Sequence, residues 1–150
     1  MSKSSFSFFC IFLLSTLPVF AQSDTWELFA KVKFTSKFYK EFNEYFLTPK
    51  FDDNIKKLEG KEVILKGHYL PFDLANKQLI VISKFPFAQC FFCGGAGPES
   101  VAEVHFKEKP RKFKADEIIT VKGRLKLNDN DVSHVNFILE DAELVLKGPV

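Results

Sequence analysis

The sequence is poor in the residues on which most catalytic and metal sites depend. Its 150 residues include three cysteines, three histidines, one tryptophan and one methionine. It contains no His-Glu-x-x-His motif, no glycine-rich phosphate loop and no recognisable Ser/His/Asp arrangement. These absences exclude the sequence signatures of zincin proteases, P-loop proteins and serine hydrolases. We therefore expect a protein that is not an enzyme, with thiol redox chemistry as the one activity left open.

Neither sign of charge predominates in the chain. Lysine and arginine number 21 and aspartate and glutamate 19, which gives a formal net charge of +2. Proteins that bind nucleic acid or an anionic membrane surface usually carry a clear excess of positive charge. The balance therefore argues against nucleic acid as a partner.

Long apolar runs are absent except near the N-terminus. Residues 1–21 combine Lys3, an apolar stretch from Phe6 to Leu14, a break at Pro18 and a Val19-Phe20-Ala21 end. This order of features is typical of a signal peptide, and the stretch is shorter than the roughly 20 apolar residues of a membrane span. We predict export to the periplasm, cleavage after this segment and no transmembrane span thereafter; an uncleaved anchor is the alternative.

Residues 22–60 are predicted to form an extension that packs against the rest of the chain. Apolar and polar residues alternate from Trp26 to Thr35, which favours a half-buried strand, with a helix capped by Asp24 as the alternative. Aromatic residues at helical spacing leave Ser36 to Leu47 ambiguous. Asp52 to Gly60 resembles a short helix.

Residues 61–150 show strand patterns without intervening helices. The predicted strands are Glu62–Leu70, Gln78–Ser83, Val101–Phe106, Glu117–Leu127 and Val132–Leu146, the last bent near Glu140-Asp141. Gly67 and Gly123 lie within strands, where glycine often marks a bulge or a tight bend. Asn128 to Asp131 is predicted to be a turn rather than a calcium loop. The pattern indicates a mostly β protein with a small five-stranded OB-like barrel, joined to the extension in one globular unit.

The segment between the second and third predicted strands is the main candidate for chemistry. Cys90 and Cys93 are two residues apart and are followed by glycines, so both thiolates can reach one metal ion. A structural zinc site needs four ligands. The best additional ligand is His105, and the less favoured ones are His68, His134 and Glu99. The sequence thus predicts a zinc or copper site built on Cys90, Cys93 and His105.

Two other interpretations of the cysteine pair remain open. In an oxidising compartment Cys90 and Cys93 can form a structural disulfide, and the protein would then be a binding or scaffold module of an envelope protein complex. A redox-active pair is the second alternative, although the residues from Gly94 to Pro98 are unfavourable for the helix that commonly activates such a thiol. The neighbouring phenylalanines are predicted to pack against the end of the barrel, with an exposed patch as the alternative: Phe85, Phe87, Phe91 and Phe92.

The chain resembles a group of exported bacterial proteins of unknown function. The resemblance rests on Trp26 in the opening segment, Pro49-Lys50-Phe51, Leu58-Glu59-Gly60-Lys61-Glu62-Val63 and the loop from Cys90 to Ser100. It implies an exported protein with an OB-like fold and brings no established activity. Relatives that carry Cys and His in this loop imply metal ligation rather than a disulfide.

Overall fold

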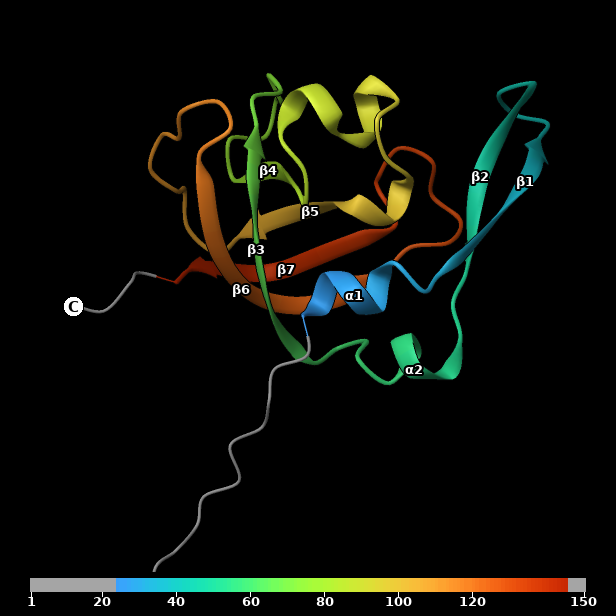
Figure 1. The fold of residues 1–150 in the computed structure, drawn as a ribbon, viewed down its shortest axis with the longest axis horizontal. Helices are drawn as coiled ribbons and strands as arrows, with labels where there is room; N and C mark the ends of the chain where they lie inside the picture. The colour runs from blue at the N-terminus through green and yellow to red at the C-terminus, as the bar shows by residue number, and fades with distance from the viewer. Residues whose placement is uncertain (1–23, 146–150) are drawn as a thin grey trace, which may run out of the picture.

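The computed structural model describes residues 24–145. The predicted signal peptide, residues 1–21, lies outside them. A closed barrel of five strands carries two short helices, α1 (Thr25–Phe29) and α2 (Asp53–Lys56), and a projecting two-stranded hairpin (Figure 1). About 43% of the described residues are in strands and 15% in helices. Within this part of the chain, no helix has both the length and the apolar character needed to cross a membrane.

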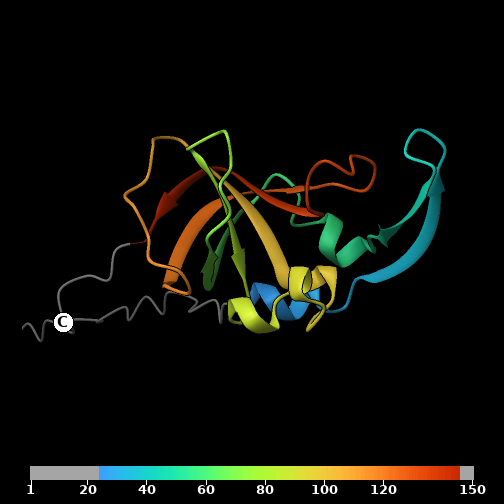
Figure 2. The same ribbon diagram turned by 90° about the horizontal axis from the view of Figure 1, so that it is seen from above.

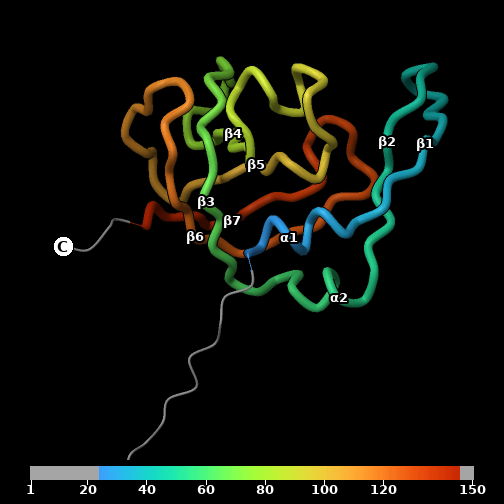
Figure 3. Tube along the Cα trace, viewed as in Figure 1, coloured from blue at the N-terminus to red at the C-terminus, as the bar shows by residue number. Residues whose placement is uncertain are grey.

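The barrel strands follow the predicted order along the chain. They are β3 (Glu62–Leu70), β4 (Leu79–Ser83), β5 (Val101–Phe106), β6 (Ile118–Leu127) and β7 (Phe137–Leu144). In space they close in the order β3-β4-β5-β7-β6, with β5 and β7 parallel and the other neighbours antiparallel (Figure 3). This arrangement confirms the mostly β, OB-like prediction.

Both strand glycines lie where the barrel bends or is closely approached. The pairing of β6 with β7 shifts register between Lys122 and Arg124, so Gly123 lies at a bulge, as predicted. At Gly67, an added Cβ would lie 2.7 Å from the carbonyl oxygen of Ser83. The indole of Trp26 covers the same position and donates from Nε1 to the carbonyl oxygen of Lys66 at 2.8 Å. Glycine at position 67 therefore lets helix α1 and strand β4 approach β3.

The first element is a helix, so the prediction of a strand from Trp26 is wrong for its first residues. Asp24 caps α1 by accepting the backbone N–H of Trp26 at 3.1 Å, which is the capping that the helical alternative required. Trp26 and Phe29 lie three residues apart on one helix face, and both are buried. The ring of Phe29 stacks on Phe137 at a centroid distance of 3.9 Å. Helix α1 thereby covers one end of the barrel. The burial of Trp26 and Phe29 there favours a helix over the strand that the alternating pattern predicts.

The ambiguous segment after α1 forms a hairpin, not a helix. Strands β1 (Lys33–Tyr39) and β2 (Glu44–Lys50) pair antiparallel and extend away from the barrel in Figures 1 and 2. The aromatic residues that lie at helical spacing in the sequence pair across the strands instead, as Phe38 and Tyr45 do at 5.0 Å. A hairpin satisfies the backbone locally while it presents aromatic side chains on both faces.

An ion pair closes the basic connection between β5 and β6. Arg111 Nη2 lies 2.6 Å from Glu117 Oε1, and the Lys114 N–H donates to Glu117 Oε2 at 2.9 Å. The hydrogen bond from Arg111, followed by that from Lys114, lowers the pKa of Glu117 from 4.5 to about 2. The ion pair therefore holds the connection to the start of β6.

We expect Gly67→Ala to destabilise the fold by about 2 kcal/mol, because the new methyl group collides with backbone that cannot move independently. Urea unfolding measures the loss. Gly123→Ala is the matched control, since its nearest atoms would lie at 3.1 Å and the expected cost is smaller. Equal stability of Gly67→Ala and the wild type would contradict the close packing of α1 and β4 on β3.

Glu117 is expected to contribute to acid sensitivity. Because its pKa is lower in the folded protein than the ordinary 4.5, its stabilising contribution is complete above about pH 4.5 and is lost as the pH falls towards about 2. Glu117→Gln should therefore lower the free energy of unfolding at pH 7 and flatten its decline between pH 4.5 and 2. Urea unfolding at several pH values measures this, with Glu41→Gln in the exposed hairpin turn as control.

Candidate metal centre and thiol loop

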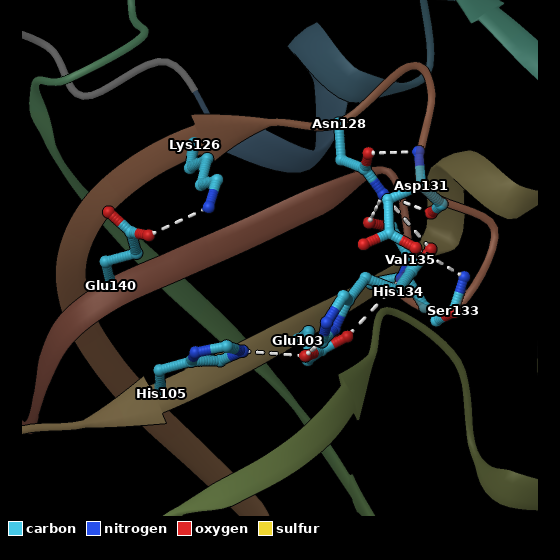
Figure 4. Close-up of polar contacts among 9 residues, drawn as sticks. All are labelled: Glu103, His105, Lys126, Asn128, Asp131, Ser133, His134, Val135 and Glu140. Carbon is cyan, nitrogen blue, oxygen red and sulfur yellow. Dashed lines mark hydrogen bonds and ion pairs between the residues drawn. The ribbon is translucent and has the colours of Figure 1, made fainter.

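A buried carboxylate lies on the outer face of the barrel. Along β5, Ala102 and Val104 point into the barrel core, so Glu103 and His105 point outwards. Glu103 is nevertheless only 4% exposed. The loop of residues 128–136, between β6 and β7, covers it (Figure 4). A charged side chain is thus held in an outer layer of the protein that water hardly reaches.

Three groups satisfy the Glu103 carboxylate. His105 Nε2 lies 2.6 Å and His134 Nδ1 2.7 Å from Oε1, and the Val135 N–H donates to Oε2 at 3.3 Å. Both imidazoles converge on the same oxygen in Figure 4. Without a metal ion, both imidazoles donate hydrogen bonds to the Glu103 carboxylate. These bonds replace the water that the buried carboxylate lacks.

Asn128 positions His134. Its side-chain Nδ2 donates to the carbonyl oxygens of Asp131 at 2.7 Å, His134 at 3.2 Å and Val135 at 3.2 Å, while Oδ1 accepts the Asp131 N–H at 2.9 Å. One buried amide therefore orders the backbone of the loop. The predicted last strand begins five residues too early at Val132, because these local hydrogen bonds compete with the barrel ladder.

The cluster contains the residue types of a metal site. Among the described residues, Glu103, His105 and His134 are the one group of three or more His, Cys, Asp or Glu whose ligand atoms all lie within 4.8 Å of one another. Two imidazoles and one carboxylate are the protein ligands of many zinc sites that keep a fourth position open. A zinc ion would take the place of the protons that the imidazoles share with the carboxylate.

The cysteine loop has the turned shape that its glycines predict. It consists of three single turns of 3₁₀ helix, η1 (Phe87–Gln89), η2 (Phe91–Cys93) and η3 (Pro98–Ser100). The Cys93 and Gly95 N–H groups both donate to the Cys90 carbonyl oxygen, at 3.1 and 3.2 Å. Gly94 has a φ of 77°, a left-handed conformation that favours glycine. The last of these turns, η3, packs against α1, whereas η1 packs against β3.

The two thiols differ in exposure. Both are free; Cys90 is completely buried and Cys93 is exposed. Partial desolvation, and then the hydrogen bond with Cys90, raise the pKa of the Cys93 thiol above 9.0. A raised pKa disfavours the thiolate, which is the form that binds metals and attacks disulfides. The environment of Cys93 thus supports neither an activated thiol nor a ready-made thiolate ligand.

The structure separates His105 from the cysteines. In the β4–β5 ladder, Val101 pairs with Ser83 beside the cysteine loop, whereas His105 pairs with Leu79 at the opposite end. Four residues of strand separate Val101 from His105, which is about 13 Å. The sequence prediction placed His105 near the cysteines because it follows Cys93 by only twelve residues. In the structure, strand β5 leads His105 away from the cysteine loop.

The other predicted ligands, His68, Glu99 and His134, lie in three different parts of the structure. His68 lies on β3, with Nδ1 3.3 Å from the carbonyl oxygen of Asp116. Glu99 folds its carboxylate over Gly97 in the cysteine loop. His134, which the sequence ranked below His105, joins the cluster with it, whereas Glu103 was not among the predicted ligands. Its one sequence signal is a Glu-x-His spacing, which puts both side chains on one face of a strand.

The loop phenylalanines pack less completely than predicted: the rings of Phe87 and Phe92 lie against Phe72, and part of each stays exposed. Phe91 is half-buried and contacts a second apolar cluster of Leu70, Val81, Cys90 and Val101. Phe85, Phe87 and Phe92 are exposed.

A groove of about 810 Å³ lies between the cysteine loop, the hairpin and the loop of residues 128–136. Strands β4 and β5 contribute Val81, Val101 and Glu103 to its lining, and His134 also lines it. The candidate metal cluster therefore borders a cavity of ligand-binding size.

Comparison with known proteins adds no assignment to these features: no protein-family model, curated protein or solved structure matches the chain.

Proposed function

We propose that this protein is an exported, periplasmic zinc-binding protein whose ion is held by Glu103, His105 and His134. The observation that carries the proposal is the convergence of two imidazole nitrogens on one buried carboxylate oxygen, at 2.6 and 2.7 Å. Histidine nitrogen and carboxylate oxygen suit zinc, whereas copper(I) prefers thiolates. Export is supported by the signal-peptide pattern of residues 1–21.

The surroundings of the cluster support metal binding in two further ways. The Val135 N–H fixes the orientation of Glu103 through the oxygen that the imidazoles do not use. Such outer contacts raise the affinity of a site because they hold a ligand in position before the ion arrives. The histidine side chains remain 34% and 39% exposed, which leaves a path for an ion to enter.

The metal proposal differs from the sequence prediction in its ligands. Among the described residues, no third Cys, His, Asp or Glu brings a ligand atom within 4.8 Å of both cysteine sulfurs. A structural zinc site with only two ligands is incomplete. We therefore assign the ion to the His/Glu cluster and treat the thiols separately.

The metal-free protein is expected to bind one zinc ion at pH 7.5, measured by calorimetry and by metal analysis after dialysis. His134→Asn should weaken binding by at least about 100-fold, because it removes a ligand from an accessible loop position. Binding should also weaken as the pH falls, since imidazole must be deprotonated to ligate. Zinc at 100 times its Kd should stabilise the fold by about 2.7 kcal/mol.

His68→Asn is the matched control for this experiment, because His68 is the remaining histidine and lies outside the cluster. It should bind zinc as the wild type does. Equal loss in both histidine variants, or no zinc bound by the wild type, would refute the site. Loss only in a Cys90→Ser/Cys93→Ser variant would return the ion to the cysteine loop.

The Cys-x-x-Cys spacing and the influence of Cys90 on the pKa of the Cys93 thiol favour a second candidate function. Both thiols are free and are not at disulfide distance, so oxidation in the periplasm to a structural disulfide would require the loop to bring them together. The protein would then be a stabilised binding module of an envelope protein complex. A redox role is the less supported version, since the raised pKa of Cys93 opposes thiolate formation.

Air-oxidised protein is expected to resist alkylation at positions 90 and 93 and to be about 2 kcal/mol more stable than the reduced protein, because the disulfide closes a short loop. Alkylation with mass spectrometry and urea unfolding measure these two properties. The comparison uses one sequence in two oxidation states, which avoids a buried Ser at position 90. Persistent free thiols after oxidation would refute the disulfide. A reduction potential well above about −300 mV would indicate redox activity instead.

A further inference from the structure

The groove beside the metal cluster has an aromatic lining. Its volume of about 810 Å³ lies within the range of about 300 to 1,000 Å³ that small-molecule sites occupy. The hairpin contributes Tyr39, Tyr45 and Phe46, and the cysteine loop contributes Phe91 and Phe92. These rings come from two separate segments that face each other across the groove.

Several of these rings are more exposed than apolar side chains usually are. Tyr45 is 71% exposed and Phe92 48% exposed, although both line the groove. Apolar groups gathered at a cavity mouth commonly mark a binding site, because an occupant removes them from water. The hairpin makes no strand pairing with the barrel, and its two strands form a separate sheet. The exposed rings are therefore not part of the core and are available to contact a ligand.

The charges at the groove have one sign. The lining includes Asp73, Glu103, Asp129 and Asp131 and contains no Lys or Arg, although these number 21 in the chain. Lys77 pairs with Asp73 at 2.7 Å, so that carboxylate is neutralised by a neighbour outside the lining. Hydrogen bonding from Ser133 lowers the pKa of Asp131, which keeps it ionised. A positive ligand would thus be attracted and an anion repelled.

We infer that this groove binds a small organic cation, in which a positive nitrogen or phosphorus group is carried on an apolar body. The apolar body would lie against the aromatic rings of the hairpin and the cysteine loop. Its charge would be attracted by the faces of those rings and by the carboxylates of the 128–136 loop. An anionic or neutral ligand of the same shape lacks the second attraction.

The inference does not depend on zinc binding. Zinc at Glu103 would leave Asp129 and Asp131 as negative groups on the groove. Measurements in EDTA therefore test the groove alone, and their outcome is separable from that of the zinc experiment.

The experiment compares two probes of nearly identical size and shape, the tetraphenylphosphonium cation and the tetraphenylborate anion. Calorimetry in EDTA should show one phosphonium ion bound, and at least tenfold weaker binding of the borate. Binding of the phosphonium should weaken as salt rises, because exposed charges contribute to it. Equal or tighter binding of the borate, or no binding of either ion, would overturn the inference.

Variants place the probe in the groove. Phe92→Ala should weaken phosphonium binding by about tenfold, because it removes an aromatic face and its apolar area. Phe85→Ala is the matched control, since Phe85 is an exposed ring of the same loop that does not line the groove. Asp129→Asn should weaken binding about threefold, as expected of an exposed charge. Equal effects of the two phenylalanine variants would show adhesion to exposed rings and would refute a site in the groove.

Discussion

The buried carboxylate of Glu103 constrains the outer layer of this protein. A charged group at 4% exposure is costly unless hydrogen bonds compensate for lost water. His105 comes from the same strand, whereas His134 and the Val135 N–H come from the loop that folds over it. The loop must keep its shape for the carboxylate to remain satisfied. The need of the buried carboxylate for hydrogen-bond donors also brings two histidines to one oxygen. The same contacts therefore stabilise the outer layer and form the candidate metal site.

Around that constraint, the protein has two apolar layers. The inner layer fills the barrel, and helix α1 closes its end with Trp26 and Phe29. The outer layer covers the outward face of β4 and β5 with the cysteine loop, where Cys90 is completely buried. Because both faces of β4 are covered, its sequence from Leu79 to Ile82 is a continuous apolar run. The groove opens where this outer cover ends and the hairpin begins.

The chemistry is concentrated on the outer face of one strand pair. Val81 and Val101 form part of the groove, Glu103 joins the groove to the histidine cluster, and His105 lies beyond it. Cys90 packs on the same outer face against Val81 and Val101, whereas His105 pairs with Leu79 at the end of the ladder away from Val101. This spacing separates a thiol site from an imidazole site on the same protein. A metal ion at the cluster and an apolar cation in the groove would occupy adjoining but different places.

The sequence by itself determined the barrel and the turned cysteine loop. Alternation over Glu62–Leu70 and Ile118–Leu127 is a local property, and bulges at glycine follow from the missing side chain. The sequence did not determine the helix at Trp26. The residues there fit both the two-residue period of a strand and the three-residue spacing of a helix face, and packing against the end of the barrel selects the helix. Nor did the sequence determine that Ser36 to Leu47 forms a hairpin. The sequence did not determine the candidate ligand set either. His105 follows Cys93 by only twelve residues, but it lies on strand β5, which leads away from the cysteine loop. Only the tertiary structure, by folding the 128–136 loop over β5, brought His134 to Glu103.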